Sequence, residues 1–192
     1  MRRPLRHTAG LTAAVLAIAV PVAGCGATHA RRSIVAGPTP TIPASILAGE
    51  RPIGLGTRFT PRTVTGHPTG GCQAKPGTHV AHVELFGANR VILITPGVGH
   101  HGRCYGNAVT FDPTGTVYFR PGATLQDLFT AWGQQLSPTR LLSFTGRVRA
   151  YLDGKQVPFP PKLTEHAEIV LEVGPYVPPH SHYTFAPPPA GF

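Results

Sequence analysis

The side chains of this sequence that could do chemistry are mainly cysteines and histidines. The chain of 192 residues contains three cysteines and ten histidines. A thiolate can take an acyl chain, form a disulfide or bind a soft metal, and neutral imidazole is a common ligand of zinc and copper. The surroundings of each residue in the sequence indicate which of these reactions to expect.

Cys25 follows a segment with the order of a secretory signal. Arg2, Arg3 and Arg6 precede an uncharged run from Leu11 to Val22, which is a basic head followed by an apolar stretch. The run has about 12 residues, whereas a bilayer-spanning helix needs roughly 20. Residues 1–24 are therefore predicted to be a cleaved signal.

The end of this run, Val22-Ala23-Gly24-Cys25, resembles the bacterial lipobox. The resemblance implies cleavage before Cys25 and transfer of diacylglycerol to its sulfur. Each buried CH₂ contributes about 0.8 kcal/mol, so two or three acyl chains anchor a protein without a transmembrane helix. We expect a lipid anchor in the bilayer at the extracytoplasmic face of the cell membrane. The alternative is an ordinary secretory signal in which Cys25 has no role.

Cys72 and Cys104 then remain as an even pair in a compartment that permits oxidation. A disulfide between them would close a loop of about 33 residues, which contributes roughly 3 to 4 kcal/mol in the chain-entropy model. Two separate thiols, or two thiolates that bind a metal, are the alternatives.

The charge of the chain is basic but dilute. Lysine and arginine number 17 against 8 acidic residues, and removal of the three signal arginines leaves 14 against 8. No run of five or more basic residues occurs, and export separates the chain from nucleic acid, so we expect no nucleic-acid partner. Anionic lipid headgroups or cell-wall polymers suit this charge better, although solubility explains it equally well.

Proline and glycine mark the two ends of the mature chain. Residues 25–71 and 175–192 show no lasting helical or strand periodicity and contain many prolines, which remove backbone donors and fix φ. The first segment is interpreted as an extended tether and the second as a tail that is ordered only if it docks.

The core between these segments, residues 72–174, is predicted to contain several strands and one helix. Turn residues at Gly87-Ala88-Asn89 and Asp153-Gly154 indicate two hairpins. Apolar residues from Leu125 to about Gln135 recur at helical spacing, with Thr124 as N-cap and Asp127 three residues later. The expected strands are 79–86, 90–95, 116–120, 147–152, 155–157 and 168–173.

One amphipathic helix on one mixed sheet is a two-layer α+β domain. The phrases "TLQDLFTAWG" and "LTEHAEIVLEVG" resemble the helix and last strand of β-grasp domains. Fold alone does not supply a function.

Residues 72–186 also resemble an uncharacterised family of bacterial, often actinobacterial, secreted proteins and lipoproteins. The phrases that carry the resemblance are "HVAHVELF", "ITPGVG", "GRCY", "TLQDLFTAWGQQLS", "VRAYLDGKQV", "HAEIVLEVG" and "YVPP". Members of the family often carry a His-x-His pair and a His-Thr-His-Asp run, which suggest a metal. Here the second run is replaced by Val109-Thr110-Phe111-Asp112.

A metal site would therefore be depleted, and its candidate ligands for copper or zinc are His79, His82, His100 and His101. The segment Gly97 to Gly102 matches G-x-G-x-x-G, but no helix is predicted after it, so no dinucleotide is expected. A cofactor other than such a metal is not expected.

An enzyme is not expected either. The serines have no nucleophile-elbow context, and most of the eight carboxylates lie beside predicted surface strands. We therefore expect a non-catalytic binding or structural module of the cell envelope, with an envelope protein, a wall polymer or a small ligand as its partner. The alternative function is metal binding at the envelope.

Overall fold

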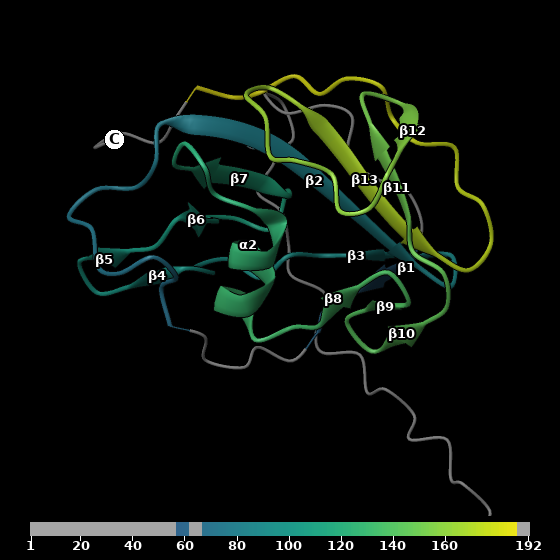
Figure 1. The fold of residues 1–192 in the computed structure, drawn as a ribbon, viewed down its shortest axis with the longest axis horizontal. Coiled ribbons are helices and arrows are strands. Elements are labelled where there is room, and N and C mark those ends of the chain that lie inside the picture. The colour runs from purple at the N-terminus through teal and green to yellow at the C-terminus, as the bar shows by residue number, and fades with distance from the viewer. Residues whose placement is uncertain (1–56, 62–66, 188–192) are drawn as a thin grey trace, which may run out of the picture. The chain divides into compact units, whose positions relative to one another are not determined.

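The long strand β2, His79–Gly87, is the centre of the sheet in the computed structural model, which describes residues 57–61 and 67–187. Its first half pairs antiparallel with β7, Thr116–Phe119, and its second half pairs antiparallel with β3, Arg90–Ile92. On its other side it pairs in parallel with β13, Glu168–Val173. One mixed sheet results, with the order β1-β3-β2-β13-β11-β12 and with β7 and β6 beside the first half of β2 (Figure 1).

The remaining strands are short. In the main sheet they are β1 (Thr57–Phe59), β6 (Ala108–Val109), β11 (Arg149–Leu152) and β12 (Lys155–Val157), and outside it they are β4 (His100–His101), β5 (Cys104–Tyr105), β8 (Leu136–Ser137), β9 (Arg140–Leu141) and β10 (Phe144–Thr145). The strand β1 lies within the predicted tether, where no strand was expected. The predicted signal, Cys25 and most of the tether lie outside the described residues.

The predicted hairpins are confirmed. Ala88 and Asn89, and likewise Asp153 and Gly154, have positive φ, as a two-residue turn between twisted strands requires. The first turn joins β2 to β3 and the second joins β11 to β12.

Helix α2, Leu125–Trp132, begins at the predicted cap. The Thr124 hydroxyl accepts from the Asp127 amide, and the Asp127 carboxylate accepts from the Thr124 amide. The helix is shorter than predicted because Gly133 adopts the left-handed conformation and ends it. Its apolar face packs with alternate residues of β2 and β13, such as Val83, Leu85 and Ile169, in the main core.

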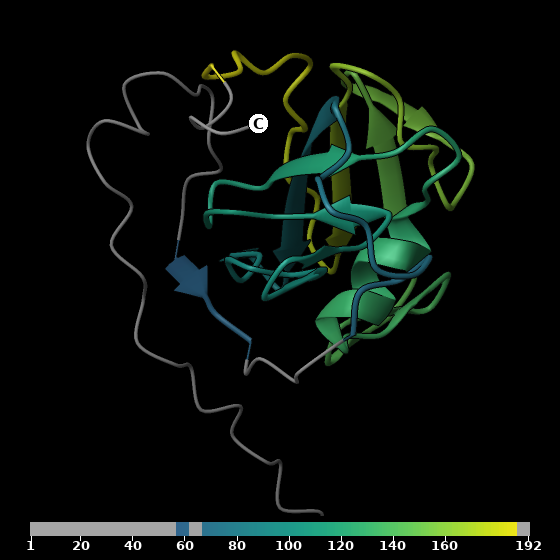
Figure 2. The same ribbon diagram turned by 90° about the vertical axis from the view of Figure 1, so that its left-hand side faces the viewer.

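The opposite face of β2 and β13 is covered by the C-terminal strap, which we define as residues 175–187. A second apolar cluster containing Phe86, Tyr151 and Val170 lies on this face, and Val177 of the strap packs against it. Figure 2 shows the strap on the side of the sheet opposite α2. The tail that was expected to be ordered only on docking is thus docked over these residues. The described chain is a mixed, sheet-rich α+β domain with one short helix.

Candidate metal centre

Three ionisable side chains are buried together between the sheet and the C-terminal strap. His82 and Glu84 lie on β2, and Glu168 lies on β13 directly beside His82 in the parallel register. The alternation of side chains along a strand places all three on the face away from α2. His82 and Glu168 are 0% exposed and Glu84 is 5% exposed. One donor atom from each lies within 4.8 Å of the others.

Both ring nitrogens of His82 are engaged. Nε2 lies 2.8 Å from the carbonyl oxygen of Thr114, and Nδ1 lies 2.7 Å from Oε2 of Glu168. A carbonyl only accepts hydrogen bonds, so the Nε2 atom carries the hydrogen and donates it to Thr114. In the neutral imidazole, Nδ1 is then an acceptor that faces the carboxyl group of Glu168.

The two carboxyl groups are incompletely satisfied. Oε2 of Glu84 lies 2.6 Å from Nδ1 of His180 on the strap. Oε1 of Glu84 and Oε1 of Glu168 are buried, and neither has a hydrogen-bond partner among the described residues. A buried polar atom without a partner costs about 1 to 3 kcal/mol, and more if it is charged. An ordered water or an ion in the cluster would satisfy these two atoms.

Burial favours the protonated form of both carboxyl groups. Loss of hydration, reinforced by the charge of Asp153 and opposed by that of His180, raises the pKa of Glu168 to about 9. Loss of hydration likewise raises the pKa of Glu84, and the contact with His180 opposes it. Near neutral pH, Glu168 therefore holds a proton on Oε2 and donates it to Nδ1 of His82.

The strap closes the cluster from the other side. The ring of Tyr183 stacks on that of His82, with 3.6 Å between ring centroids and 6° between planes. His180 reaches Glu84, and the Val177 amide donates to Oε2 of Glu172 at 2.9 Å. These contacts hold the strap along β2 and β13.

The hydrogen bonds of Glu172 can be compared with those of the cluster, because Glu172 is as buried as Glu168 and lies on the same face of β13. Its Oε1 accepts from Arg149 Nε at 2.6 Å and from the Tyr151 hydroxyl at 2.9 Å, and its Oε2 accepts from the strap. Both of its oxygens have partners, so Glu172 has a structural role. Glu84 and Glu168 lack this complete set.

The donor atoms of the cluster are of the types that divalent transition metals use as ligands. Ligands about 2.0 to 2.1 Å from a tetrahedral ion lie about 3.4 Å apart, so small side-chain rotations would bring the three donors onto one ion. Metal-binding histidines usually donate their second N–H to a backbone carbonyl, and His82 already does so toward Thr114. Imidazole and carboxylate together suit zinc, copper and iron(II).

Only His82 of the four histidines predicted as ligands belongs to this cluster. His79 forms an ion pair with Glu165 at 2.6 Å. His100 and His101 lie on β4, where the His100 ring stacks on Tyr105. Among the described residues, none of these three joins a group of three potential ligands.

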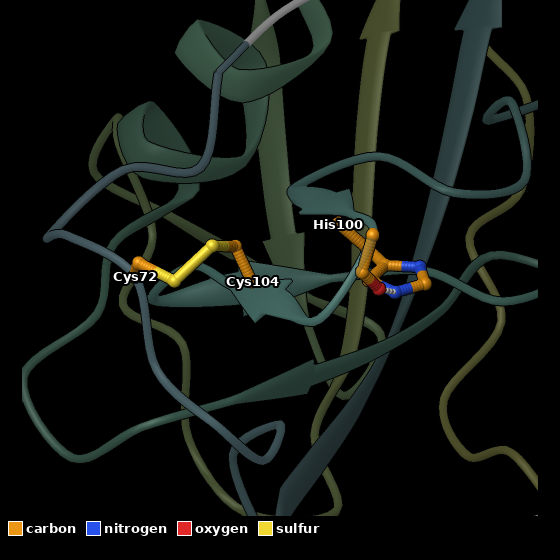
Figure 3. Close-up of a disulfide and its surroundings, with 4 residues drawn as sticks. Cys72, His100 and Cys104 are labelled. Atoms are coloured by element: carbon orange, nitrogen blue, oxygen red, sulfur yellow. Dashed lines mark hydrogen bonds between the residues drawn. A yellow bond between two sulfur atoms is a disulfide. The ribbon is translucent and has the colours of Figure 1, made fainter.

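Cys72 and Cys104 form the predicted pair, with their sulfurs 2.01 Å apart. Figure 3 shows the His100 imidazole pointing away from this disulfide, and its Nε2 lies 2.7 Å from the Gly102 carbonyl oxygen. A joint site of His100 and Cys104 is therefore not formed.

The carboxylates of the cluster were not predicted from the sequence. The prediction that most acidic residues lie beside surface strands is wrong for Glu84, Glu168 and Glu172, since all three are buried within strands. The feature of the sequence that could have indicated their burial is the position of these glutamates inside the apolar runs of β2 and β13, on the same face as His82.

No protein-family model matches the chain, and neither the search of curated proteins nor that of solved structures found a match. Among the described residues, no helix is long and apolar enough to cross a membrane.

Proposed function

We propose that this chain is a lipid-anchored, non-catalytic protein of the cell envelope that binds one divalent transition metal, zinc or copper, through His82, Glu84 and Glu168. The observation that carries the metal proposal is the pair of buried carboxylate oxygens without partners beside Nδ1 of His82. A metal ion would satisfy both oxygens at once.

Charge balance supports the proposal. Burying two carboxylates without a counter-ion is costly, because each loses its hydration in a region of low dielectric constant. A divalent cation with two carboxylates and neutral imidazole leaves no net charge. In the absence of metal, bound protons neutralise the carboxylates instead, which agrees with the raised pKa values of Glu84 and Glu168.

His180 is the proposed fourth ligand. Its Nδ1 already contacts Glu84 Oε2, so a small rotation would direct it to an ion between the glutamates. Two nitrogens and two oxygens complete a tetrahedron. A zinc site with four protein ligands keeps no open position for a substrate, which favours storage or delivery of the metal over catalysis.

The anchor and the location are proposed from the sequence. Residues 1–24 and the lipobox-like Val22-Ala23-Gly24-Cys25 support lipidation of Cys25. We further propose membership of the secreted and lipoprotein family that residues 72–186 resemble, and a β-grasp core, on the resemblance of the segments that form α2 and β13.

Calorimetric titration of the mature chain with zinc and copper tests metal binding. Cys25→Ser removes the acylation site and keeps the chain soluble for the measurement. We expect one ion per chain, and at least about 100-fold weaker binding in Glu84→Gln or Glu168→Gln, since loss of one charged ligand costs several kcal/mol.

Glu172→Gln is the matched control, because it changes an equally buried glutamate of the same strand outside the cluster. It should lower stability and leave the zinc affinity unchanged. Equal zinc affinity in the Glu168 variant and the parent would refute the site.

Membrane fractionation of cells tests the anchor. The parent chain should remain with membranes, and Cys25→Ala should appear in the soluble extracytoplasmic fraction. Equal retention of both forms would exclude Cys25 as the anchor.

A further inference from the structure

Four arginines gather at the end of the sheet where β2 and β13 finish. We define Arg58, Arg90, Arg140 and Arg147 as the arginine end. Arg90 begins β3 directly beside Gly87, the last residue of β2, and Gly87 is also paired with Val173, the last residue of β13. Arg58 lies on β1, whose first residue Thr57 pairs with Arg90.

The β9–β10 hairpin brings the other two arginines to this end. The ring of Phe144 in β10 lies directly over Gly87, and Gly146 lies against Val173. Arg140 is paired with Thr145, and Arg147 follows Gly146. Figure 1 shows β8, β9 and β10 next to the ends of β2 and β13.

Among the described residues, no ion pair joins any of these four arginines to a carboxylate. Glu172 is the carboxylate of β13 nearest this end, and it is buried and paired with Arg149. Asp153 and Glu168 lie at the opposite end, where Leu152 pairs with Ile169. Glu165 is also there, bound to His79 at the start of β2. Arg90, Arg140 and Arg147 are exposed to solvent.

Tyr176, just beyond the end of β13, carries an exposed aromatic ring that lies 6.4 Å from the ring of Tyr151. It is 63% exposed, and among the described residues it is the one large hydrophobic side chain that is exposed. Tyr176 lies three residues after the end of β13, and it follows Gly174, whose carbonyl accepts from Arg149. Tyrosine is enriched at the boundary between lipid and water, where its ring is in the headgroup region and its hydroxyl is hydrated.

We propose that the arginine end and Tyr176 dock on the surface of an anionic phospholipid bilayer. This inference rests on the proposed lipid anchor, because Thr57, the first described residue after Cys25, lies at this end beside Arg90. Arginines bind lipid phosphates, and a basic residue near an anionic surface strengthens binding by about fivefold. The acyl chains would hold the protein at the membrane, and the arginine end would orient it.

Vesicle sedimentation tests the docking surface without the anchor. The probe is the mature chain with Cys25→Ser, mixed with phosphatidylcholine vesicles that either contain or lack phosphatidylglycerol. We expect binding to the anionic vesicles, at least fivefold weaker binding to the neutral ones, and a decrease as salt is raised. Comparable binding to both vesicles, or to neither, would overturn the proposal.

Two triple variants with the same change of charge separate a local surface from net charge. Arg90→Glu, Arg140→Glu and Arg147→Glu together should weaken binding by at least about 100-fold. Lys75→Glu, Lys155→Glu and Lys162→Glu change three exposed lysines outside the arginine end and should retain binding within about fivefold. Equal losses in the two variants would show that only the net charge matters.

Tyr176→Ser gives a test without a change of charge, and it should weaken binding by several fold. Circular dichroism and zinc affinity should be unchanged in all these variants. Because this chain carries no acyl group, the vesicle result stands apart from the membrane fractionation that tests Cys25. Retained membrane localisation without vesicle binding would refute the docking surface alone.

Discussion

Nδ1 of His82 lies 2.7 Å from Oε2 of Glu168, and both side chains are completely buried. Nε2 of the same imidazole donates to Thr114, and burial raises the pKa of Glu168 to about 9, so we assign the hydrogen between these atoms to Glu168. The pair is therefore neutral in the metal-free protein, and the proton occupies the place that we assign to the metal.

Stability of the metal-free protein should fall with rising pH. The folded-state pKa of Glu168 is about 9 against an ordinary value of 4.5, so between these values the folded state holds a proton that the unfolded state has released. The free energy of unfolding then decreases by at most about 1.4 kcal/mol per pH unit for this proton. Glu84 contributes in the same direction.

Urea denaturation with a chelator present, at several pH values across this window, checks the slope. Glu168→Gln keeps a neutral side chain of the same shape and should reduce the slope, with stability near that of the parent at the acidic end. A parent whose stability rises with pH across the window would contradict the protonation of Glu168.

Zinc binding should release between one and two protons per ion near neutral pH, because the metal replaces the proton of Glu168 and any proton that the raised pKa leaves on Glu84. Titration calorimetry in buffers with different ionisation enthalpies measures this number directly. A binding enthalpy that does not depend on the buffer would show that Glu168 is already ionised or does not bind the metal.

His180→Ala should weaken zinc binding by at least about 10-fold, because it removes the proposed fourth ligand, and loss of a group that only supports a ligand already costs about 10- to 100-fold. The control is His182→Ala, since His182 is exposed on the same strap two residues later. Competition against a chromophoric chelator compares the two variants. If both lose the same affinity, His180 has no specific part in the site.

Removal of the disulfide should destabilise the fold and leave the metal site intact. The bond between Cys72 and Cys104 spans 32 residues, so Cys72→Ala with Cys104→Ala should cost about 3 to 4 kcal/mol in chemical denaturation. Zinc stoichiometry should remain one per chain. Loss of zinc in this variant would support the alternative that these sulfurs bind the metal.

Thr124→Ala should lower the free energy of unfolding by about 1 kcal/mol, because it removes the hydroxyl that accepts from Asp127 at the start of α2. Thr130→Ala is the control, as it changes an exposed threonine within the same helix. Thermal unfolding of both variants provides the comparison. A larger loss in the Thr130 variant would contradict the importance of the cap.

Local features of this fold could be predicted because neighbouring residues determine them. Thr124 and Asp127 form the capping box, and Asp153-Gly154 forms the second hairpin, because these signals lie within a few residues of each other. The alternation along β2 also placed His82 and Glu84 on one face correctly.

The composition of the site could not be predicted in the same way. Glu168 meets His82 only because β13 pairs in parallel with β2 across 86 positions of sequence, and no local pattern specifies that pairing. Strand patterns also predict a solvated face for alternate polar residues. The strap buries that face through Tyr183 and His180, so the glutamates became core residues.

Anomalous diffraction from a zinc-loaded crystal tests the central claim most directly. We expect one strong zinc peak among Nδ1 of His82, Nδ1 of His180 and the carboxylates of Glu84 and Glu168, about 2 Å from each ligand atom. A peak at other histidines, such as His100 and His101, with the cluster unchanged, would contradict it.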